Sequence, residues 1–365
     1  MLLERNNLNY TWILRCSGSS PGHSSEFRTI PNIPRNSLLP IVEIIDEVAW
    51  DRYYDALSRQ FGAVYVELPL YLNERRNKWW SDSEGQCRNI NSQSCLDFFI
   101  GNDHRIDVPV VSSQHDNRNI RLDYSVENQL FSQIKDNFNR VGLRIGLPTY
   151  DIQSVPTSRT SLVNLLSNMT SSDTLFVDIF NVGSLIQQRL SNLAFVINNT
   201  PEQVDHIYIL NAFNPDNGEH NFGPYLARYF NVKGFGDFAT EKRFPAKVRI
   251  GPRIRTFRRN IHFYNWNRFE LYTFSEYDSY DRALAHLRSS GVWRNNSDHR
   301  ARCPACNRIE TSDTNNSHNY WKEFRIKHYL YSIVTDTRIN DNGIQTAEDL
   351  DPIGHDNLFN VGGIA

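Results

Sequence analysis

Polar and charged residues recur at the ends of apolar, β-branched runs in the first 240 residues of the sequence. Six of them follow this pattern: Arg15, Glu43, Glu67, Asp178, Asn211 and Asp237. Carboxylates that meet at one place could bind a divalent cation such as Mg²⁺ through oxygen ligands. They could also divide the roles of general acid and general base between them. The alternative is that some of them face outward and cap helices at the turns after the strands.

A second group of residues that could do chemistry lies near the C-terminal end of the sequence. Cys303 and Cys306 are separated by two residues, and His299 and His318 flank them. A C-x2-C pair is half of a zinc site, and two histidines would complete a Cys2His2 set. The alternatives are a pair of reduced, non-ligating cysteines in a turn, or a redox pair, although no thioredoxin-like βαβ pattern precedes them.

The third group is a basic segment, residues 242–259, which contains no acidic residue and is interleaved with Phe244 and Phe257. Its candidate binding residues are Lys247, Arg249, Arg253, Arg255, Arg258 and Arg259. Arginines beside aromatic rings can contact phosphates and stack on bases, so this segment is a candidate nucleic-acid contact. An acidic partner protein would explain it equally well, and a solvated connector is the third interpretation.

These groups require a scaffold, and the apolar runs predict one. Eight runs read as strands, at 10–15, 39–44, 63–67, 107–112, 141–146, 175–178, 206–211 and 233–237. Nearly continuous apolar runs are typical of parallel strands that are covered on both faces. Segments with helical spacing of apolar residues lie between several of them, at 46–61, 123–138, 157–169 and 183–196. The alternation predicts an α/β fold, a (β/α)8 TIM-barrel-like parallel barrel, whose polar strand ends would share one face.

Two regions depart from the βα alternation. Residues 70–105 form a long insertion into the barrel domain, which we place at 1–238. Residues 239–338 are expected to form an appended C-terminal α+β element that packs on the barrel, with strands at 261–264 and 269–274 and a helix at 278–289. Residues 339–365 are rich in Gly, Asp and Asn and are expected to be a flexible tail.

The bulk composition narrows the classes of function. The chain has 365 residues and a formal net charge of −2, which excludes a globally basic nucleic-acid binder but allows a local basic patch. No apolar run approaches the roughly 20 residues that span a bilayer, so we expect no membrane association. The first residues lack a signal-peptide pattern and the five cysteines are an odd number, which favours reduced thiols in the cytoplasm. The sequence contains no P-loop, GxGxxG or HExxH motif.

Several short motifs resemble those of one known family. They are the strands at 10–15 and 39–44, the run ending in Asp178, the segment 236–238, the pair Cys303 and Cys306, and the segment from Trp321 to Leu330. Together they resemble the "beta protein" family of bacteria and phages. The resemblance implies a barrel-like fold and a cytoplasmic protein encoded in loci that defend bacteria against phages. It implies no catalytic residues.

We therefore expect a sensor or effector subunit of a prokaryotic antiphage system, one that binds another protein of the same operon or a nucleic acid. The basic segment and the 70–105 insertion are the expected contact regions. One alternative is a metal-dependent hydrolase or nuclease that uses the strand-end carboxylates with Mg²⁺. A second is a structural scaffold with a C-terminal zinc site. Whether the chain is an enzyme stays open at this point.

Overall fold

The computed structural model describes residues 8–16, 38–44, 50–59, 61, 63–69, 80–81, 87–88, 91–113, 123–180, 186–211, 221–239, 259–265, 270–277, 279–311 and 318–335. Most of the basic segment lies outside these ranges, as do most of residues 70–90 in the predicted insertion and the whole 339–365 tail.

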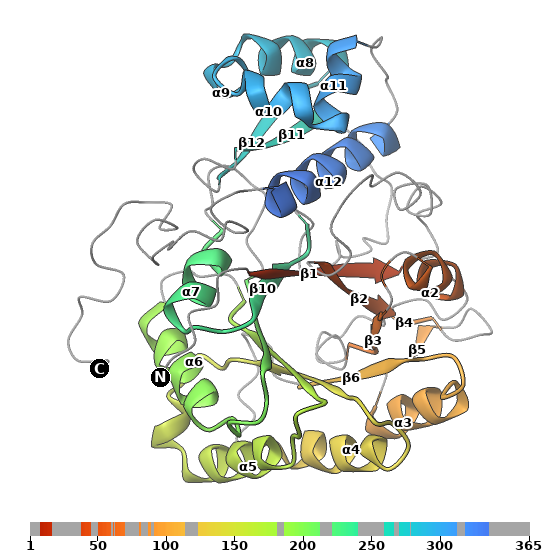
Figure 1. The fold of residues 1–365 in the computed structure, drawn as a ribbon, viewed down its shortest axis with the longest axis vertical. Helices are drawn as coiled ribbons and strands as arrows, with labels where there is room; N and C mark the ends of the chain where they lie inside the picture. Colours follow the sequence, from red (N-terminus) through yellow and green to blue (C-terminus); the bar gives the residue numbers. More distant parts are fainter. Residues whose placement is uncertain are drawn as a thin grey trace.

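Eight parallel strands close into a barrel at the centre of the molecule (Figure 1). Their order around the barrel is β1-β10-β9-β8-β7-β6-β3-β2, and β1 pairs with both β10 and β2, so the sheet has no free edge. The strands are β1 (Asn9–Cys16), β2 (Leu38–Ile44), β3 (Tyr65–Glu67), β6 (Val108–Ser112), β7 (Gly142–Gly146), β8 (Thr174–Asp178), β9 (His206–Leu210) and β10 (Gly234–Asp237). The closed barrel confirms the predicted (β/α)8 fold.

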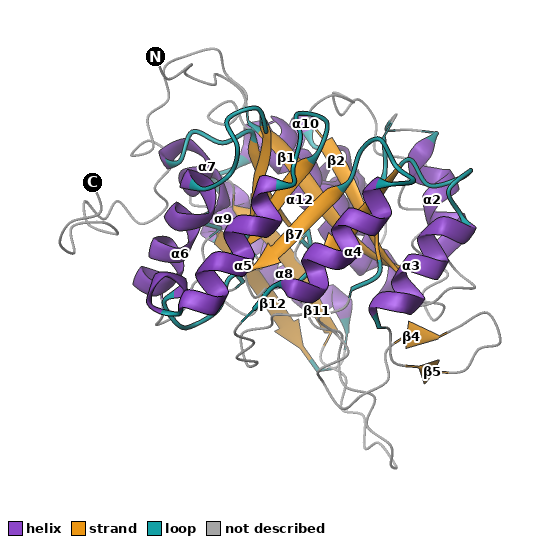
Figure 2. Ribbon diagram, turned by 90° about the horizontal axis from the view of Figure 1, so that it is seen from below, coloured by secondary structure: helices purple, strands orange, loops and turns teal. Residues whose placement is uncertain are grey.

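Helices surround the barrel (Figure 2). They are α2 (Trp50–Ser58), α3 (Ser92–Gly101), α4 (Ser125–Lys135), α5 (Pro156–Ser167) after the short η3 (Ile152–Ser154), α6 (Ile186–Asn198) and α7 (Gly223–Tyr229). The helix α3 lies inside the predicted 70–105 insertion, after the two-stranded β4 (Trp80–Ser81) and β5 (Cys87–Arg88). It begins where the Asn91 side chain accepts a hydrogen bond from the Ser94 amide, and it buries Cys95, Leu96, Phe98 and Phe99. This helix is the crossover between β3 and β6, so that part of the segment belongs to the βα repeat.

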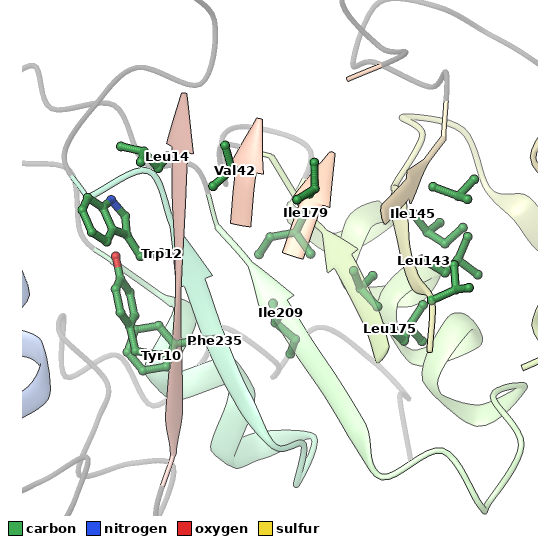
Figure 3. Close-up of a cluster of buried hydrophobic side chains, with 14 of the residues drawn as sticks. Tyr10, Trp12, Leu14, Val42, Leu143, Ile145, Leu175, Ile179, Ile209 and Phe235 are labelled. Atoms are coloured by element: carbon green, nitrogen blue, oxygen red, sulfur yellow. The ribbon is translucent and has the colours of Figure 1, made fainter. Parts of the chain in front are cut away.

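Side chains alternate between the two faces of each strand. One face packs inside the barrel and the other packs against the surrounding helices. Ile13, Ile41, Tyr65 and Phe176 belong to the small cluster that fills the barrel interior. The residues of opposite parity, such as Trp12, belong to the larger core between the strands and the helices, part of which is shown in Figure 3. This alternation decides which polar strand-end residues face the interior.

The packing inside the barrel leaves no room for a larger residue at Gly142. A Cβ there would lie 2.9 Å from Cγ2 of Val110 and 3.2 Å from the rings of Tyr65 and Phe176. We expect Gly142→Ala to lower the free energy of unfolding by about 1–3 kcal/mol through overpacking. Gly101→Ala is the matched control, since a Cβ at Gly101 has no neighbour within 4 Å. Urea unfolding of both variants checks this, and equal stabilities would contradict the tight interior.

The residues after the barrel form an α+β element, as predicted. It consists of the antiparallel pair β11 (Arg259–Asn265) and β12 (Glu270–Glu276), then α8 (Tyr280–Ser289), α9 (Gly291–Arg294), α10 (Ser297–Arg302), α11 (Pro304–Thr311) and α12 (His318–Thr335). The long helix α12 lies between this element and the barrel strands β1 and β10 (Figure 1). None of the described helices is long and apolar enough to cross a membrane.

The helix α12 joins the two hydrophobic cores. Its residues Trp321 and Phe324 pack into the core of the appended element. Ile326, Leu330 and Ile333, on another face of the same helix, pack into the large core around the barrel. One helix therefore fixes the position of the appended element on the barrel.

Candidate functional sites

A buried arginine lies at the centre of the barrel's carboxyl end. Arg144 of β7 has a side chain that is 2% exposed, and it faces the interior two residues after Gly142. Glu43, Glu67 and Asp178 each lie two residues beyond an interior residue of their own strands, so strand alternation turns all three toward Arg144. The structure thus brings together three of the six strand-end residues predicted from the sequence, around an arginine that was not among them.

The guanidinium of Arg144 contacts all three carboxylates. Its Nη1 donates to Oε1 of Glu43 at 2.7 Å and to Oε2 of Glu67 at 2.6 Å. Its Nε and Nη2 both donate to Oδ2 of Asp178, at 3.1 and 2.6 Å. The ring of Phe238 lies 5.7 Å from the guanidinium carbon. Charge-assisted hydrogen bonds to one arginine therefore organise this end of the barrel, and we call these four charged residues the Arg144 centre.

The Arg144 centre has more negative than positive charge. Burial raises the pKa of Glu67 to about 7; the guanidinium of Arg144 opposes this rise, and the Glu43 carboxylate adds to it. Oε1 of Glu67 is buried and has no hydrogen-bond partner within the described part of the chain. A pKa near neutrality is the property required of a general acid or base.

The remaining predicted residues of this ring lie elsewhere. Asp237 of β10 lies two residues after Phe235, on the same face of the strand. Phe235 packs into the core between the strands and the helices, so the carboxylate of Asp237 faces away from the barrel interior. Asn211, just after β9, lies beside Asn221, with Nδ2 3.4 Å from its Oδ1. Arg15 pairs in register with Glu43, but its side chain lies outside the described residues.

The carboxylate of Asp237 is the centre of a second polar cluster, between the barrel and α12. Oδ1 accepts from the hydroxyl of Tyr10 at 2.5 Å and from the amide of Ala239 at 2.7 Å. Oδ2 accepts from Nδ2 of Asn221 at 2.9 Å and from the hydroxyl of Tyr329. Burial raises the pKa of Asp237 to about 6, and hydrogen bonds from Tyr10 and Tyr329 limit the rise. This cluster anchors α12 to β1 and β10.

The two aspartates share a local backbone arrangement. The amide of Phe180 donates to Oδ1 of Asp178 at 3.0 Å, as the amide of Ala239 does to Asp237. Phe180 has φ 57° and Ala239 has φ 47°, a region that non-glycine residues rarely adopt. Each aspartate therefore stabilises a strained turn directly after its strand, and such strain is concentrated at functional sites.

The sequence also predicted a metal site near the C-terminal end, and the structure gathers a four-residue set there. One ligand atom each from His299, Cys303, Cys306 and His328 lies within 4.8 Å of the others, and all four residues are buried. Three of the four are predicted ligands. His328 of α12 takes the fourth position, whereas the side chain of His318 lies outside the described residues.

The local helices explain how these four side chains meet. Cys303 ends α10 and Cys306 lies in the first turn of α11, so the C-x2-C pair spans the bend between two short helices. His328 follows Trp321 and Phe324 on one stripe of α12, the stripe that faces the appended element. That helical spacing is the sequence signal that could have indicated His328.

The protonation states of two members of this cluster, Cys303 and His299, suit metal ligation. Burial opposes ionisation of Cys303, but hydrogen bonds from Cys306, His299 and His328 outweigh it and lower the pKa of its thiol to about 2. Burial lowers the pKa of His299, which keeps the imidazole neutral. Cysteine binds a metal as the thiolate and histidine as the neutral imidazole, so Cys303 and His299 have the required form. Burial and the neighbouring Cys303 raise the pKa of Cys306, so a bound metal would have to displace its proton.

The predicted basic segment is described only at its last residue. Arg259 begins β11 and its guanidinium lies over the ring of Tyr280 at 5.6 Å. Lys247, Arg249, Arg253, Arg255 and Arg258 lie outside the described residues.

An open pocket of about 440 Å³ lies farther along the same hairpin. It is lined by Asn265, Tyr272, Phe274, Ser290, Gly291, Val292, Asn295 and Asn296. Among these described lining residues there is no Asp, Glu, Lys, Arg or His, so the pocket offers aromatic faces and amides but no strong acid or base.

Comparison with known proteins gives matches only among solved structures. No protein-family profile and no curated protein matches the chain. Triosephosphate isomerase from Bartonella henselae is similar at 11% identity and a TM-score of 0.39, over 65% of this chain and 94% of that one. A mandelate racemase/muconate lactonizing protein from Herpetosiphon aurantiacus is similar at 11% identity and a TM-score of 0.35, over 64% of this chain and 55% of that one.

Proposed function

We propose that this chain is a cytoplasmic sensor or effector subunit of a prokaryotic antiphage system, and that it acts by binding single-stranded nucleic acid through its appended element. The observation that carries the proposal is the pocket on the β11–β12 hairpin. Tyr272 and Phe274 supply half-buried aromatic faces, and Asn265, Asn295 and Asn296 supply amides. Stacking on aromatic rings and hydrogen bonding by amides are the usual means of holding unpaired bases.

The sequence that precedes β11 supports the same target. Arg259 lies on β11 two residues before Ile261, and Ile261 pairs in register with Phe274 of the pocket. The basic residues 242–258 precede Arg259 in the sequence. Positive charge beside stacking platforms is typical of single-strand binding sites, because phosphate contacts supply affinity and rings hold the bases. The antiphage setting rests on the resemblance of the sequence motifs to the "beta protein" family, as does an operon-encoded partner protein.

The Arg144 centre argues against the alternative of a metal-dependent hydrolase or nuclease. Glu43, Glu67 and Asp178 would be the ligands of Mg²⁺, but each already contacts the guanidinium at 2.6–2.7 Å. A cation at this position would have to displace Arg144 within a buried site, where two unpaired positive charges are costly. One observation favours a catalytic role: the pKa of Glu67 near 7 would allow proton transfer without a metal.

Binding of a labelled RNA or DNA strand of about 15 nucleotides, measured by fluorescence anisotropy, tests the proposal. We expect Tyr272→Ala to weaken binding about 5–150-fold, which corresponds to the loss of about 1–3 kcal/mol of stacking on one base. The affinity falls as salt rises, and replacing Arg253, Arg255, Arg258 and Arg259 with Ala should make the slope of log K against log salt shallower by about 3.

Tyr277→Ala is the matched control, because Tyr277 is 60% exposed and follows β12 outside the pocket. Its affinity should equal that of the wild type. Absence of binding, or equal loss in the Tyr272 and Tyr277 variants, would overturn nucleic-acid recognition at this pocket. Co-purification with the product of a neighbouring gene, lost on the arginine substitutions, would instead favour an acidic partner protein.

A further inference from the structure

We propose that His299, Cys303, Cys306 and His328 bind one structural Zn²⁺ ion and that this ion ties the appended element to the barrel. The inference is independent of the proposed function. Zinc in structural sites is four-coordinate and tetrahedral, and Cys2His2 is one of its standard ligand sets.

The distances at the site fit this geometry. Nδ1 of His328 lies 3.3 Å from Sγ of Cys306 and 3.7 Å from Sγ of Cys303. A tetrahedral ion with the usual Zn–S and Zn–N bond lengths places sulfur and nitrogen about 3.5 Å apart. A direct disulfide would need only the two cysteines and leaves the convergence of both imidazoles unexplained.

The second nitrogen of each histidine has its own partner. Nε2 of His328 lies 3.0 Å from the backbone carbonyl of Tyr264, so Nε2–H donates and Nδ1 is left as the lone-pair ligand. Nε2 of His299 lies 3.3 Å from the hydroxyl of Ser332. The His328 ring is also stacked between Phe263 and Phe324, with centroids 4.3 and 5.6 Å away. Outer contacts that fix the tautomer and orientation of a histidine are typical of metal ligands.

The burial of all four side chains favours a bound metal ion in this cluster. Cys303, Cys306 and His328 are 0% exposed and His299 is 5% exposed. Two thiolates and two neutral imidazoles around Zn²⁺ form a site with no net charge, which a buried position can tolerate. All four coordination positions are filled by the protein, and solvent is excluded, so the site is of the structural and not the catalytic kind.

The position of His328 gives the ion its role. The next residue, Tyr329, donates to Asp237 at the end of β10, and its ring contacts Tyr264 at 4.7 Å. The ion would therefore connect α10 and α11 to α12 one residue away from the contact between α12 and the barrel. Its loss should loosen the appended element.

Elemental analysis of the purified full-length chain tests the site directly. We expect about one zinc per chain in the wild type, and less than a tenth of that in Cys303→Ser and His328→Gln. Chelation of the wild type should lower its unfolding temperature, and added Zn²⁺ should restore it. Co²⁺ in place of Zn²⁺ should give the visible absorption bands of a tetrahedral thiolate site. The chelation and Co²⁺ measurements need only the wild type, so they hold even if a ligand variant does not fold.

Matched variants distinguish these ligands from other cysteines and histidines. Cys95→Ser removes a buried free thiol of α3, His286→Gln removes an exposed histidine of α8, and His318→Gln removes the ligand that sequence spacing favoured. All three should keep a full complement of zinc. The proposal is overturned if the wild type has no zinc and mass spectrometry finds a Cys303–Cys306 disulfide, or if His318→Gln loses the metal and His328→Gln retains it.

Discussion

Replacement of Arg144 with methionine is expected to destabilise the chain by about 3–5 kcal/mol. Methionine keeps much of the side-chain length but removes the charge that Glu43, Glu67 and Asp178 share. Removal of one partner from a buried ion cluster leaves uncompensated buried charge, which is among the most costly single changes in a folded protein. Chemical denaturation at pH 7 measures the loss.

The pH dependence gives this prediction a specific signature. Burial raises the pKa of Glu67 and the guanidinium of Arg144 opposes that rise, so Arg144→Met should raise this pKa further, and Glu67 should take up a proton as the pH falls. When a group has a higher pKa in the folded chain than in the unfolded chain, it stabilises the folded chain at low pH. This contribution is lost as the pH rises through the pKa of the folded chain. The difference between Arg144→Met and the wild type should therefore shrink from pH 8 to pH 5.

Arg159→Met is the matched control for the arginine substitution, because Arg159 is exposed on α5. It should change the free energy of unfolding by less than about 0.5 kcal/mol. A loss in Arg144→Met that equals the control, or that grows at low pH, would contradict the Arg144 centre.

Replacement of Asp237 with alanine is expected to cost at least about 3 kcal/mol. Four donors converge on this carboxylate, from Tyr10, Asn221, Ala239 and Tyr329. Each buried donor that loses its partner costs about 1–3 kcal/mol, although neighbouring losses are not additive. The same substitution removes the acceptor that holds α12 against β10.

Tyr329→Phe provides a graded comparison for Asp237→Ala. It keeps the ring contact with Tyr264 and removes the hydrogen bond that Tyr329 donates to Asp237 and the one that it accepts from Asn221, so about 1.5–3 kcal/mol should be lost. Thermal unfolding of both variants shows which of them loses more stability. A larger loss in Tyr329→Phe than in Asp237→Ala would show that the carboxylate is not the centre of this cluster.

The barrel could be predicted because its signal is local. Each apolar run between helical segments reports one buried strand, and eight such runs in βα alternation close most simply as a barrel. The strands β11 and β12 and the helix α8 were also predicted, since alternation and helical spacing remain readable outside the barrel.

The direction of the strand-end side chains could not be predicted. Strands buried on both faces show no alternation of apolar and polar residues, so the sequence does not reveal which parity faces the interior. Asp178 and Asp237 both end apolar runs, yet Asp178 contacts Arg144 inside the barrel and Asp237 contacts Tyr10 and Tyr329 outside it. Arg144 was missed because it lies within a strand, where a single charge has no motif.

The fourth metal ligand was missed for a related reason. His318 is closer to Cys306 in sequence, and spacing alone favours the nearer histidine. The helix α12 carries His328 back to the C-x2-C pair, and only the stripe formed with Trp321 and Phe324 indicates this. Convergence of this kind depends on tertiary packing and not on a short motif.

Titration of the full-length chain with Mg²⁺ in a calorimeter tests the central claim, that Arg144 takes the place of a cation among the strand-end carboxylates. Zinc at the cysteine–histidine site does not interfere, because thiolates and imidazoles are poor ligands for Mg²⁺. We predict no saturable binding at the Arg144 centre in the wild type. Stoichiometric Mg²⁺ binding that Glu43→Gln abolishes would contradict the account and would restore the metal-dependent hydrolase.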